Sequence, residues 1–194
     1  MQTLDSIKQA LVRWFVVSGC IILVATYFYQ ANVFIPTRWP FQYFLSGITI
    51  GLAYATFRVD NYRIGLLVLV LWYLGVTLPF AGNNSWIFIL EAVYIVMIAA
   101  GVYIYLYFIR KPFVKDEVRR VGVSILIMGL SNCLIIPVLS LFTIGASIHH
   151  LSRLVDTMSL NVQIGALLGL LMGIATEFAE YLVGLLSRST AVAS

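Results

Sequence analysis

Residues 110–120 read Arg110-Lys-Pro-Phe-Val-Lys-Asp-Glu-Val-Arg-Arg120 and form the only dense run of charge in the chain. Apolar segments long enough to cross a membrane lie on both sides of this run. A basic loop between two apolar spans is typical of the cytoplasmic side of a membrane. The run therefore predicts the direction in which the neighbouring helices cross. The side chains that we expect to anchor this loop at the cytoplasmic surface are Arg110, Lys111, Lys115, Arg119 and Arg120.

The composition supports a membrane protein. The chain has 194 residues, of which 61% are hydrophobic and only 10% are charged, and its mean hydropathy is +0.98. Soluble domains carry about 25% charged residues, so this chain could not cover a water-exposed surface. The net charge of +4 resides in short loops between apolar segments, which favours anionic lipid headgroups as a partner and gives no support to nucleic acid.

Six apolar segments are long enough to span a hydrocarbon core of about 30 Å as helices. The sequence therefore predicts an all-α integral membrane protein, a bundle of six transmembrane helices that forms a single polytopic domain over residues 1–194. A polar connection is expected at residues 145–159, before the last span. The expected spans are residues 11–29, 41–57, 64–80, 86–109, 121–144 and 160–186.

The distribution of Lys and Arg predicts the orientation. Ten of these residues fall on one set of alternate connections and two on the other, which is a strong positive-inside bias. We expect both termini on the cytoplasmic side of a bacterial or archaeal cytoplasmic (inner) membrane. The first set is Lys8, Arg13, Arg58, Arg63, Arg110, Lys111, Lys115, Arg119, Arg120 and Arg188, and the second is Arg38 and Arg153.

Two spans carry glycines at every fourth position. The pattern is Gly47-x-x-x-Gly51 in the second span and Gly165-x-x-x-Gly169-x-x-x-Gly173 in the sixth. Small residues at this spacing let helix backbones approach closely in a membrane. Packing within the bundle is the simpler interpretation, and a face that docks a partner or a second copy is the alternative.

Two carboxylates, Glu177 and Glu180, lie inside the sixth span near its inner end. A carboxylate in a bilayer is costly and almost always faces the bundle interior, a partner or water. One hypothesis is a proton or cation site. The other is a structural role, in which these groups pair with Arg13, Arg58 or Arg119 or reach the inner headgroups.

Polar residues also gather on the opposite, outer side of the predicted bundle. Hydrogen-bonding groups with aromatic neighbours are typical of small-molecule sites, although a solvated loop explains the same residues. We call this set the outer cup, and its candidate ligand-binding residues are Trp86, Glu91, His149, His150, Arg153, Asp156 and Asn161. Adjacent histidines are a weak metal signal, so no metal site is predicted, and no cofactor is indicated.

The sequence contains no HExxH, GxSxG or Walker motif, and it does not favour an enzyme. A lipid-modifying enzyme that uses no simple motif remains an open alternative. In length, span number and orientation the chain resembles the substrate-binding components of energy-coupling-factor vitamin importers. That resemblance implies a small six-helix protein that binds a ligand from outside and works with partner chains.

We therefore expect a transport component or membrane subunit that binds a small ligand, ion or lipid at the outer cup and docks to other membrane chains or to itself. The first alternative is a non-catalytic structural or assembly subunit of a larger membrane complex. The second is a homo-oligomeric channel in which Glu177 or Glu180 faces a shared pore.

Overall fold

The computed structural model of the protein describes residues 2–30, 40–58, 62–77, 85–109, 114–142 and 151–192. These ranges hold six helices and no strand. The helices are α1 (Gln2–Gln30), α2 (Pro40–Phe57), α3 (Tyr62–Thr77), α4 (Ser85–Ile109), α5 (Glu117–Phe142) and α6 (Leu151–Val192). The expected connection over residues 145–159 is thus helical from Leu151 onward, and in that part the expectation was wrong.

Four of the described helices are long and apolar enough to cross a membrane. The qualifying stretches are Ser6–Tyr27 in α1, Ala92–Ile109 in α4, Glu117–Ile135 in α5 and Met158–Arg188 in α6. The apolar part of α2, Phe44–Phe57, is shorter. α3 is also short, at 16 residues. The described part of the chain is therefore all-helical, with the long apolar helices that are typical of a membrane protein.

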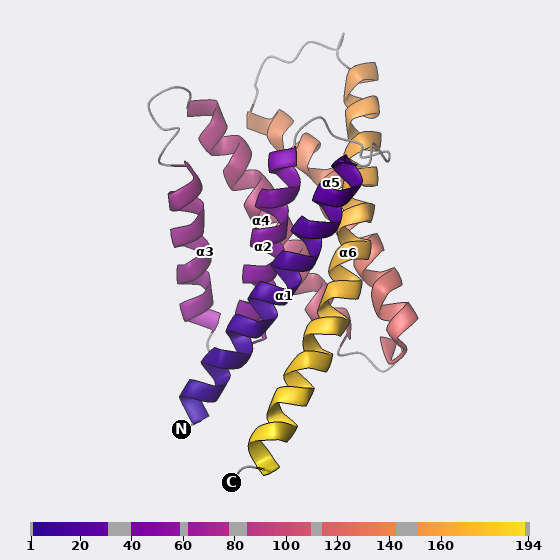
Figure 1. The fold of residues 1–194 in the computed structure, drawn as a ribbon. Coiled ribbons are helices and arrows are strands. Elements are labelled where there is room, and N and C mark those ends of the chain that lie inside the picture. Colours follow the sequence, from indigo (N-terminus) through magenta and orange to yellow (C-terminus); the bar gives the residue numbers. More distant parts are fainter. Residues whose placement is uncertain are drawn as a thin grey trace.

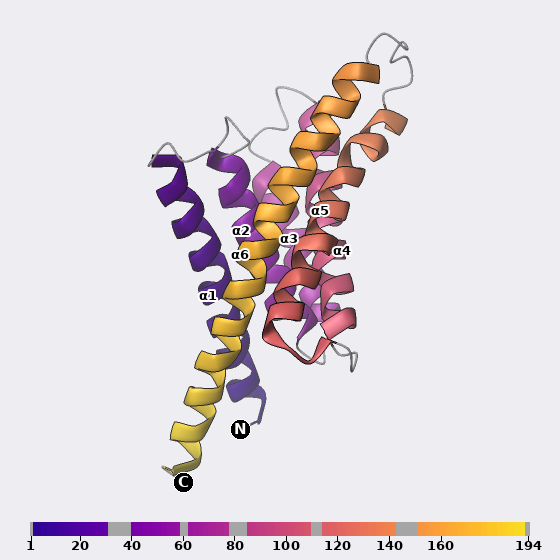
Figure 2. The same cartoon turned by 90° about the vertical axis from the view of Figure 1, so that its right-hand side faces the viewer.

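The helices lie side by side in one bundle, and successive helices run in opposite directions (Figure 1). The start of α1 and the end of α6 consequently lie at the same end of the bundle, as a second view also shows (Figure 2). The most extensive contacts join α5 to α6 and α1 to α2. Among the described helices, α3 makes its main contacts with α2 and α4, so it lies at the edge.

Local sequence explains where two helices begin. α2 begins at Pro40, whose fixed φ suits the first turn of a helix and whose missing N–H would have had no partner there. The carbonyl of Asp116 accepts the first helical hydrogen bond of α5 from the Arg120 N–H at 3.0 Å. The Arg120 guanidinium also donates to the Lys115 carbonyl at 2.9 Å. The loop before α5 is therefore tied to the first turn of this helix.

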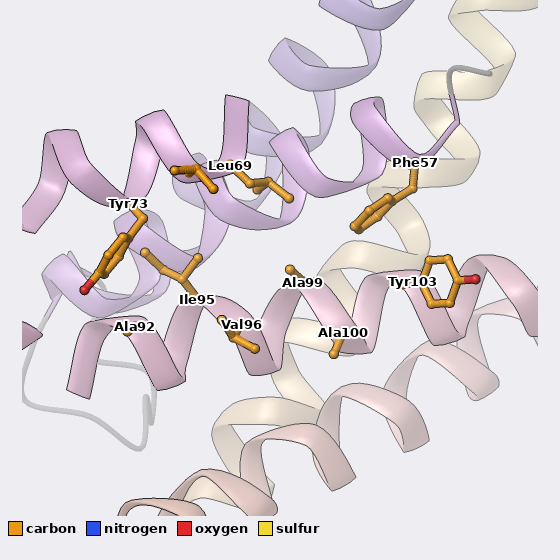
Figure 3. Close-up of a pocket in the computed structure, with 10 residues that line it drawn as sticks. Phe57, Leu69, Tyr73, Ala92, Ile95, Val96, Ala99, Ala100 and Tyr103 are labelled. Atoms are coloured by element: carbon orange, nitrogen blue, oxygen red, sulfur yellow. The ribbon is translucent and has the colours of Figure 1, made fainter. Parts of the chain in front are cut away.

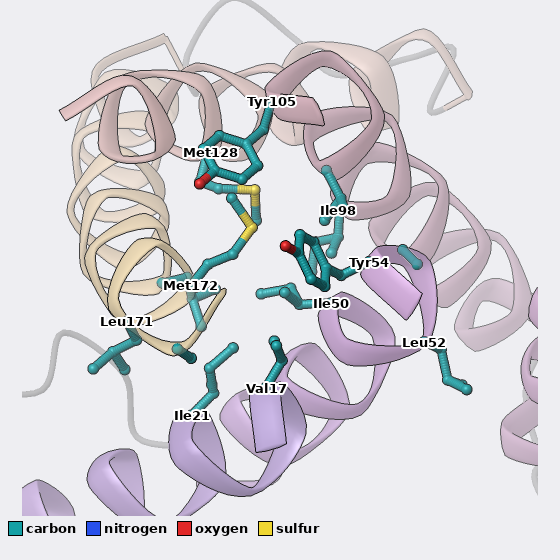
Figure 4. Close-up of a cluster of buried hydrophobic side chains, with 14 of the residues drawn as sticks. Val17, Ile21, Ile50, Leu52, Tyr54, Ile98, Tyr105, Met128, Leu171 and Met172 are labelled. Carbon is teal, nitrogen blue, oxygen red and sulfur yellow. The ribbon is translucent and has the colours of Figure 1, made fainter. Parts of the chain in front are cut away.

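The core lies between α1, α2, α4, α5 and α6. Aromatic, aliphatic and methionine side chains from all five helices meet there (Figure 4). The largest of those that are almost wholly buried are Tyr54, Tyr105, Ile21, Ile50, Ile98, Met128, Leu168 and Met172. Of the described side chains of α3, Leu69 belongs to this buried cluster, and Val68 and Trp72 pack against it.

The glycines lie where backbones meet. A Cβ placed on Gly51 of α2 would lie 2.9 Å from the Trp14 carbonyl oxygen of α1, and one on Gly169 of α6 would lie 2.7 Å from Ile125 Cα of α5. Gly165 and Gly173 likewise contact α5, and Gly47 contacts α1. Both glycine faces are therefore used for helix contacts within the chain.

Large apolar side chains cover the outside of the bundle. Leu23, Leu126 and Leu130 have exposed fractions of 71%, 66% and 65%, and Phe15 and Tyr181 each reach 63%. Soluble monomers rarely expose contiguous apolar surface beyond a few hundred Å². A bilayer supplies the medium in which such a surface is stable.

Candidate functional site

The outer cup lies almost wholly beyond the described side chains. His149 and His150 are outside the described residues. Trp86 and Glu91 belong to α4, and Arg153 and Asp156 belong to the first turns of α6, but the side chains of these four residues are not described. Asn161, farther along α6, is partly buried. The backbone thus assigns five of the seven residues to the start of α4 or to the first part of α6, at the end of the bundle opposite the termini (Figure 1).

The opposite end holds the best-defined polar cluster. Glu180 of α6 accepts two hydrogen bonds from the Arg13 guanidinium of α1, from Nε to Oε1 at 2.8 Å and from Nη2 to Oε2 at 3.2 Å. The Tyr54 hydroxyl of α2 donates to the same Oε1 at 2.8 Å. Arg58 Nε, just after α2, lies 3.4 Å from that oxygen. We call these four residues the inner cluster.

The inner cluster joins three helices through one carboxylate. Two-pronged guanidinium–carboxylate contacts are among the strongest polar interactions in proteins, because both hydrogen bonds are charge-assisted. The exposed fractions of the Arg13 and Glu180 side chains are 13% and 30%. This pair therefore lies at the edge of the bundle and not at its centre. A charge costs less free energy at the edge than at the centre.

A second carboxylate on the same helix is paired separately. Glu177 accepts hydrogen bonds from Arg120 of α5, at 2.5 Å from Nε to Oε1 and at 2.7 Å from Nη2 to Oε2. Thr176, the preceding residue, shares a hydrogen bond of 3.3 Å with the Tyr105 hydroxyl of α4. One turn of α6 thus carries polar contacts to α1, α2, α4 and α5.

The charges of the inner cluster do not balance. One carboxylate faces two guanidinium groups, and Arg58 Nε is buried without a hydrogen bond within the described part of the chain. Although burial disfavours its charged form, the interactions with Tyr54 and Glu180 raise the pKa of Arg58. Arg58 therefore stays cationic, and the described members of the cluster carry one excess positive charge.

An apolar groove lies between α3 and α4 (Figure 3). The end of α2 lines one end of this groove. Its volume is about 730 Å³. Leu69 and Tyr73 of α3 face Ile95 and Ala99 of α4 across it. Phe57 and Tyr103 close the end nearest the termini, with ring centroids 5.5 Å apart in an edge-on arrangement.

The described residues offer no other obvious reactive centre. Cys20 and Cys133 are free thiols. Within the described ranges, no three His, Cys, Asp or Glu side chains come close enough to hold a metal ion. In the basic loop, Arg110 and Lys111 lie outside the described residues, while Lys115 and Arg119 are exposed.

The sequence suggests Arg13 and Arg58 as partners of the carboxylates, and both face Glu180 in the structure. Glu177 pairs with Arg120, the residue after the Arg119 that the sequence suggests as a partner. The role of Tyr54 and the α3–α4 groove were missed. A tyrosine in an apolar span looks like any other aromatic core residue, and a groove depends on helix spacing that no local pattern encodes.

No protein-family model, curated protein or solved structure matches the chain.

Proposed function

We propose that the protein is a six-span component of a cytoplasmic (inner) membrane, with both termini in the cytoplasm. In this proposal it is non-catalytic and serves as a transport component or membrane subunit. It binds a small ligand, ion or lipid at the outer cup and docks to partner chains at the cytoplasmic side.

The observation that carries this proposal is the continuity of α6 from Leu151 to Val192. At 1.5 Å per residue, Asp156 of the outer cup and Glu180 of the inner cluster lie about 36 Å apart along one helix. That length exceeds a hydrocarbon core of about 30 Å. A single rigid helix thus links the two polar ends of the molecule, so that a ligand at one end has a direct mechanical connection to the other.

The inner ion pairs support a binding component over a channel. Glu180 is held by Arg13, Arg58 and Tyr54, and Glu177 is held by Arg120. A carboxylate that is fully engaged by guanidinium groups stabilises the bundle and is poorly placed to line a pore. We therefore rank the homo-oligomeric channel last.

A structural or assembly subunit is the second candidate. The observation that favours it is the exposure of Lys115 and Arg119 beside the ordered start of α5. These side chains offer a cationic contact surface for another chain. The glycine faces are already used within the bundle, so such a partner would bind at this loop or at the lipid-facing surface.

Native mass spectrometry of the protein, extracted from its own membrane in a mild detergent, separates these candidates. We expect a bound small mass that is lost in the Glu91→Ala/Arg153→Ala variant. It should persist in a Lys8→Ala/Arg188→Ala control, because those exposed residues lie at the other end of the bundle. Recovery in fixed stoichiometry with other chains, with no small mass, would favour the structural subunit and overturn the ligand-binding proposal.

A further inference from the structure

The ion pairs of the inner cluster and of Arg120 lie near one level of the bundle, where they join α1, α2, α5 and α6. From this level, α2 extends from Arg58 back to Pro40 over about 27 Å, and α5 extends from Arg120 to Phe142 over about 33 Å. A hydrocarbon core is about 30 Å thick. The helices between these charges and the opposite end of the bundle therefore already fill the core, and the charges mark one border of it.

α6 continues beyond this border, and so does the start of α1, whereas α5 begins near it (Figure 2). The apolar stretch of α6 ends at Arg188, which lies about 12 Å beyond Glu180 along the helix. A headgroup layer is about 5–8 Å thick. Within this projecting end, the side chains of Tyr181 and Leu185 have exposed fractions of 63% and 45%. Apolar surface of α6 therefore extends through the headgroup layer to its aqueous side.

The face of α6 that packs against α5 continues into the projecting end. At about 100° per residue, Gly184 falls between Gly173 and Glu177 around the helix axis, and both of these residues contact α5. Among the described residues, no other helix comes within 4 Å of a Cβ added to Gly184. An established helix interface is thus continued by a surface that no described residue covers. We call this surface the projecting face, and its residues are Tyr181, Gly184 and Leu185.

Basic residues border the projecting face. Lys115 and Arg119 are exposed at the start of α5, and Arg188 is exposed on α6. Residues 110–120 include five basic and two acidic residues, so this segment stays cationic after one of them pairs with Glu177. Complementary charge favours a binding partner and like charge rejects it. The projecting face therefore favours an acidic partner and disfavours a second copy of the chain.

A flat bilayer does not match this arrangement. Headgroups that reach Lys115 and Arg119 lie at the border that the charges mark, and their acyl chains extend from there towards the middle of the membrane. Leu185 lies about 7.5 Å beyond Glu180, on the opposite side of that border, where a bilayer offers headgroups and water. A bilayer that covered this side chain would have to thicken locally, which costs free energy for each Å.

We propose that the projecting face docks an amphipathic segment of a cytoplasmic partner chain. The apolar side chains of this segment lie against Tyr181 and Leu185, and its Asp or Glu side chains face Lys115 and Arg119. The missing side chain at Gly184 lets the backbone of the segment come close to α6. The inference rests on the docking at the cytoplasmic side proposed above, and it adds the surface and the chemistry of the partner.

The test introduces the photo-crosslinking residue p-benzoylphenylalanine at Tyr181 in cells of the native host. We expect a covalent adduct with another protein, and mass spectrometry should map it to a peptide that combines apolar residues with a net negative charge. Tyr103 of α4 is the matched control position, because its exposed fraction of 59% is close to the 63% of Tyr181. It lies inside the apolar stretch Ala92–Ile109 and should not give that adduct.

Lys115→Gln/Arg119→Gln should lower the yield of the adduct about fivefold, as the loss of two exposed ion pairs predicts, and Lys115→Arg/Arg119→Lys should retain it. Thermal unfolding of each variant shows whether it is folded. The proposal is overturned if Tyr181 gives only lipid adducts, an adduct with a second copy or no adduct, or if the folded Gln variant keeps the yield. A small mass that is still bound at the outer cup would then show that the docking surface has failed and the proposed ligand binding has not.

Discussion

Arg13 and Glu180 are 167 positions apart in the chain, and they meet through two hydrogen bonds that join the first helix to the last. Glu180 also accepts a hydrogen bond from Tyr54 of α2. The contact therefore joins α1 to α6 in the half of each helix that is nearer the chain termini. The contribution of this contact to stability depends on which charged groups lose their partner when one residue is replaced.

Glu180→Gln should destabilise the protein by about 1–3 kcal/mol. Breaking a fully buried ion pair costs about 3–5 kcal/mol because it leaves a charge uncompensated, and solvent reduces this cost where the carboxylate is partly exposed. The exposed fraction of Glu180 is 30%. Thermal unfolding in a fixed detergent measures the change. Arg13→Gln/Glu180→Gln should recover part of the loss, and strictly additive losses would show that the pair does not interact.

Glu177→Gln should cost less than Glu180→Gln, because it releases one guanidinium group instead of two. The charge-exchanged variant Glu177→Arg/Arg120→Glu should be more stable than either of its two single variants. Unfolding of the four proteins in parallel gives the coupling energy. A charge-exchanged protein no more stable than the worse single variant would contradict a specific Glu177–Arg120 contact.

Gly169→Ala should separate α5 from α6 and cost about 1–3 kcal/mol, as overpacking of a tight contact does. The added Cβ would lie 2.7 Å from Ile125 Cα, and a backbone atom cannot move aside as a flexible side chain can. Gly184→Ala is the control in the same helix, because nothing lies within 4 Å of its added Cβ. That change should be neutral or stabilise the helix by about 0.5–1 kcal/mol. Equal effects would refute the close contact.

The proposed orientation is open to a labelling test. In a background that lacks Cys20 and Cys133, a cysteine at Asn84 should react with a membrane-impermeant maleimide in intact cells. A cysteine at Asp116, which is exposed beside α5, should react only after the membrane is permeabilised. Labelling of Asp116→Cys in intact cells would place the basic loop outside and reverse the proposed topology.

The helical class could be predicted from the sequence, because a membrane requires long apolar helices and excludes charged loops from its interior. Helix ends were less readable. α6 begins at Leu151, ahead of the expected span, because polarity marks the border of a hydrocarbon layer and not the end of a helix. Polar residues such as Arg153 and Asp156 can be part of an α-helix in water as well as at the membrane interface.

The candidate site was less predictable than the fold. Carboxylates inside a span are rare because a charge in a membrane is costly, so Glu177 and Glu180 could be identified from the sequence. Their individual partners depend on how five helices rotate about their axes. That rotation follows from the fit of many side chains around Met128, Met172 and Tyr54, and a one-dimensional pattern does not contain it.

The position of Glu180 also has a consequence for how the protein is made. Arg13 and Arg58 leave the ribosome long before their shared carboxylate, because synthesis proceeds from the first helix to the last. Until α6 enters the membrane, both guanidinium groups remain uncompensated, and the early helices carry a charge that the bilayer disfavours. Insertion of the last helix thus supplies the one carboxylate that both guanidinium groups share, and the first and last helices are joined only at that point.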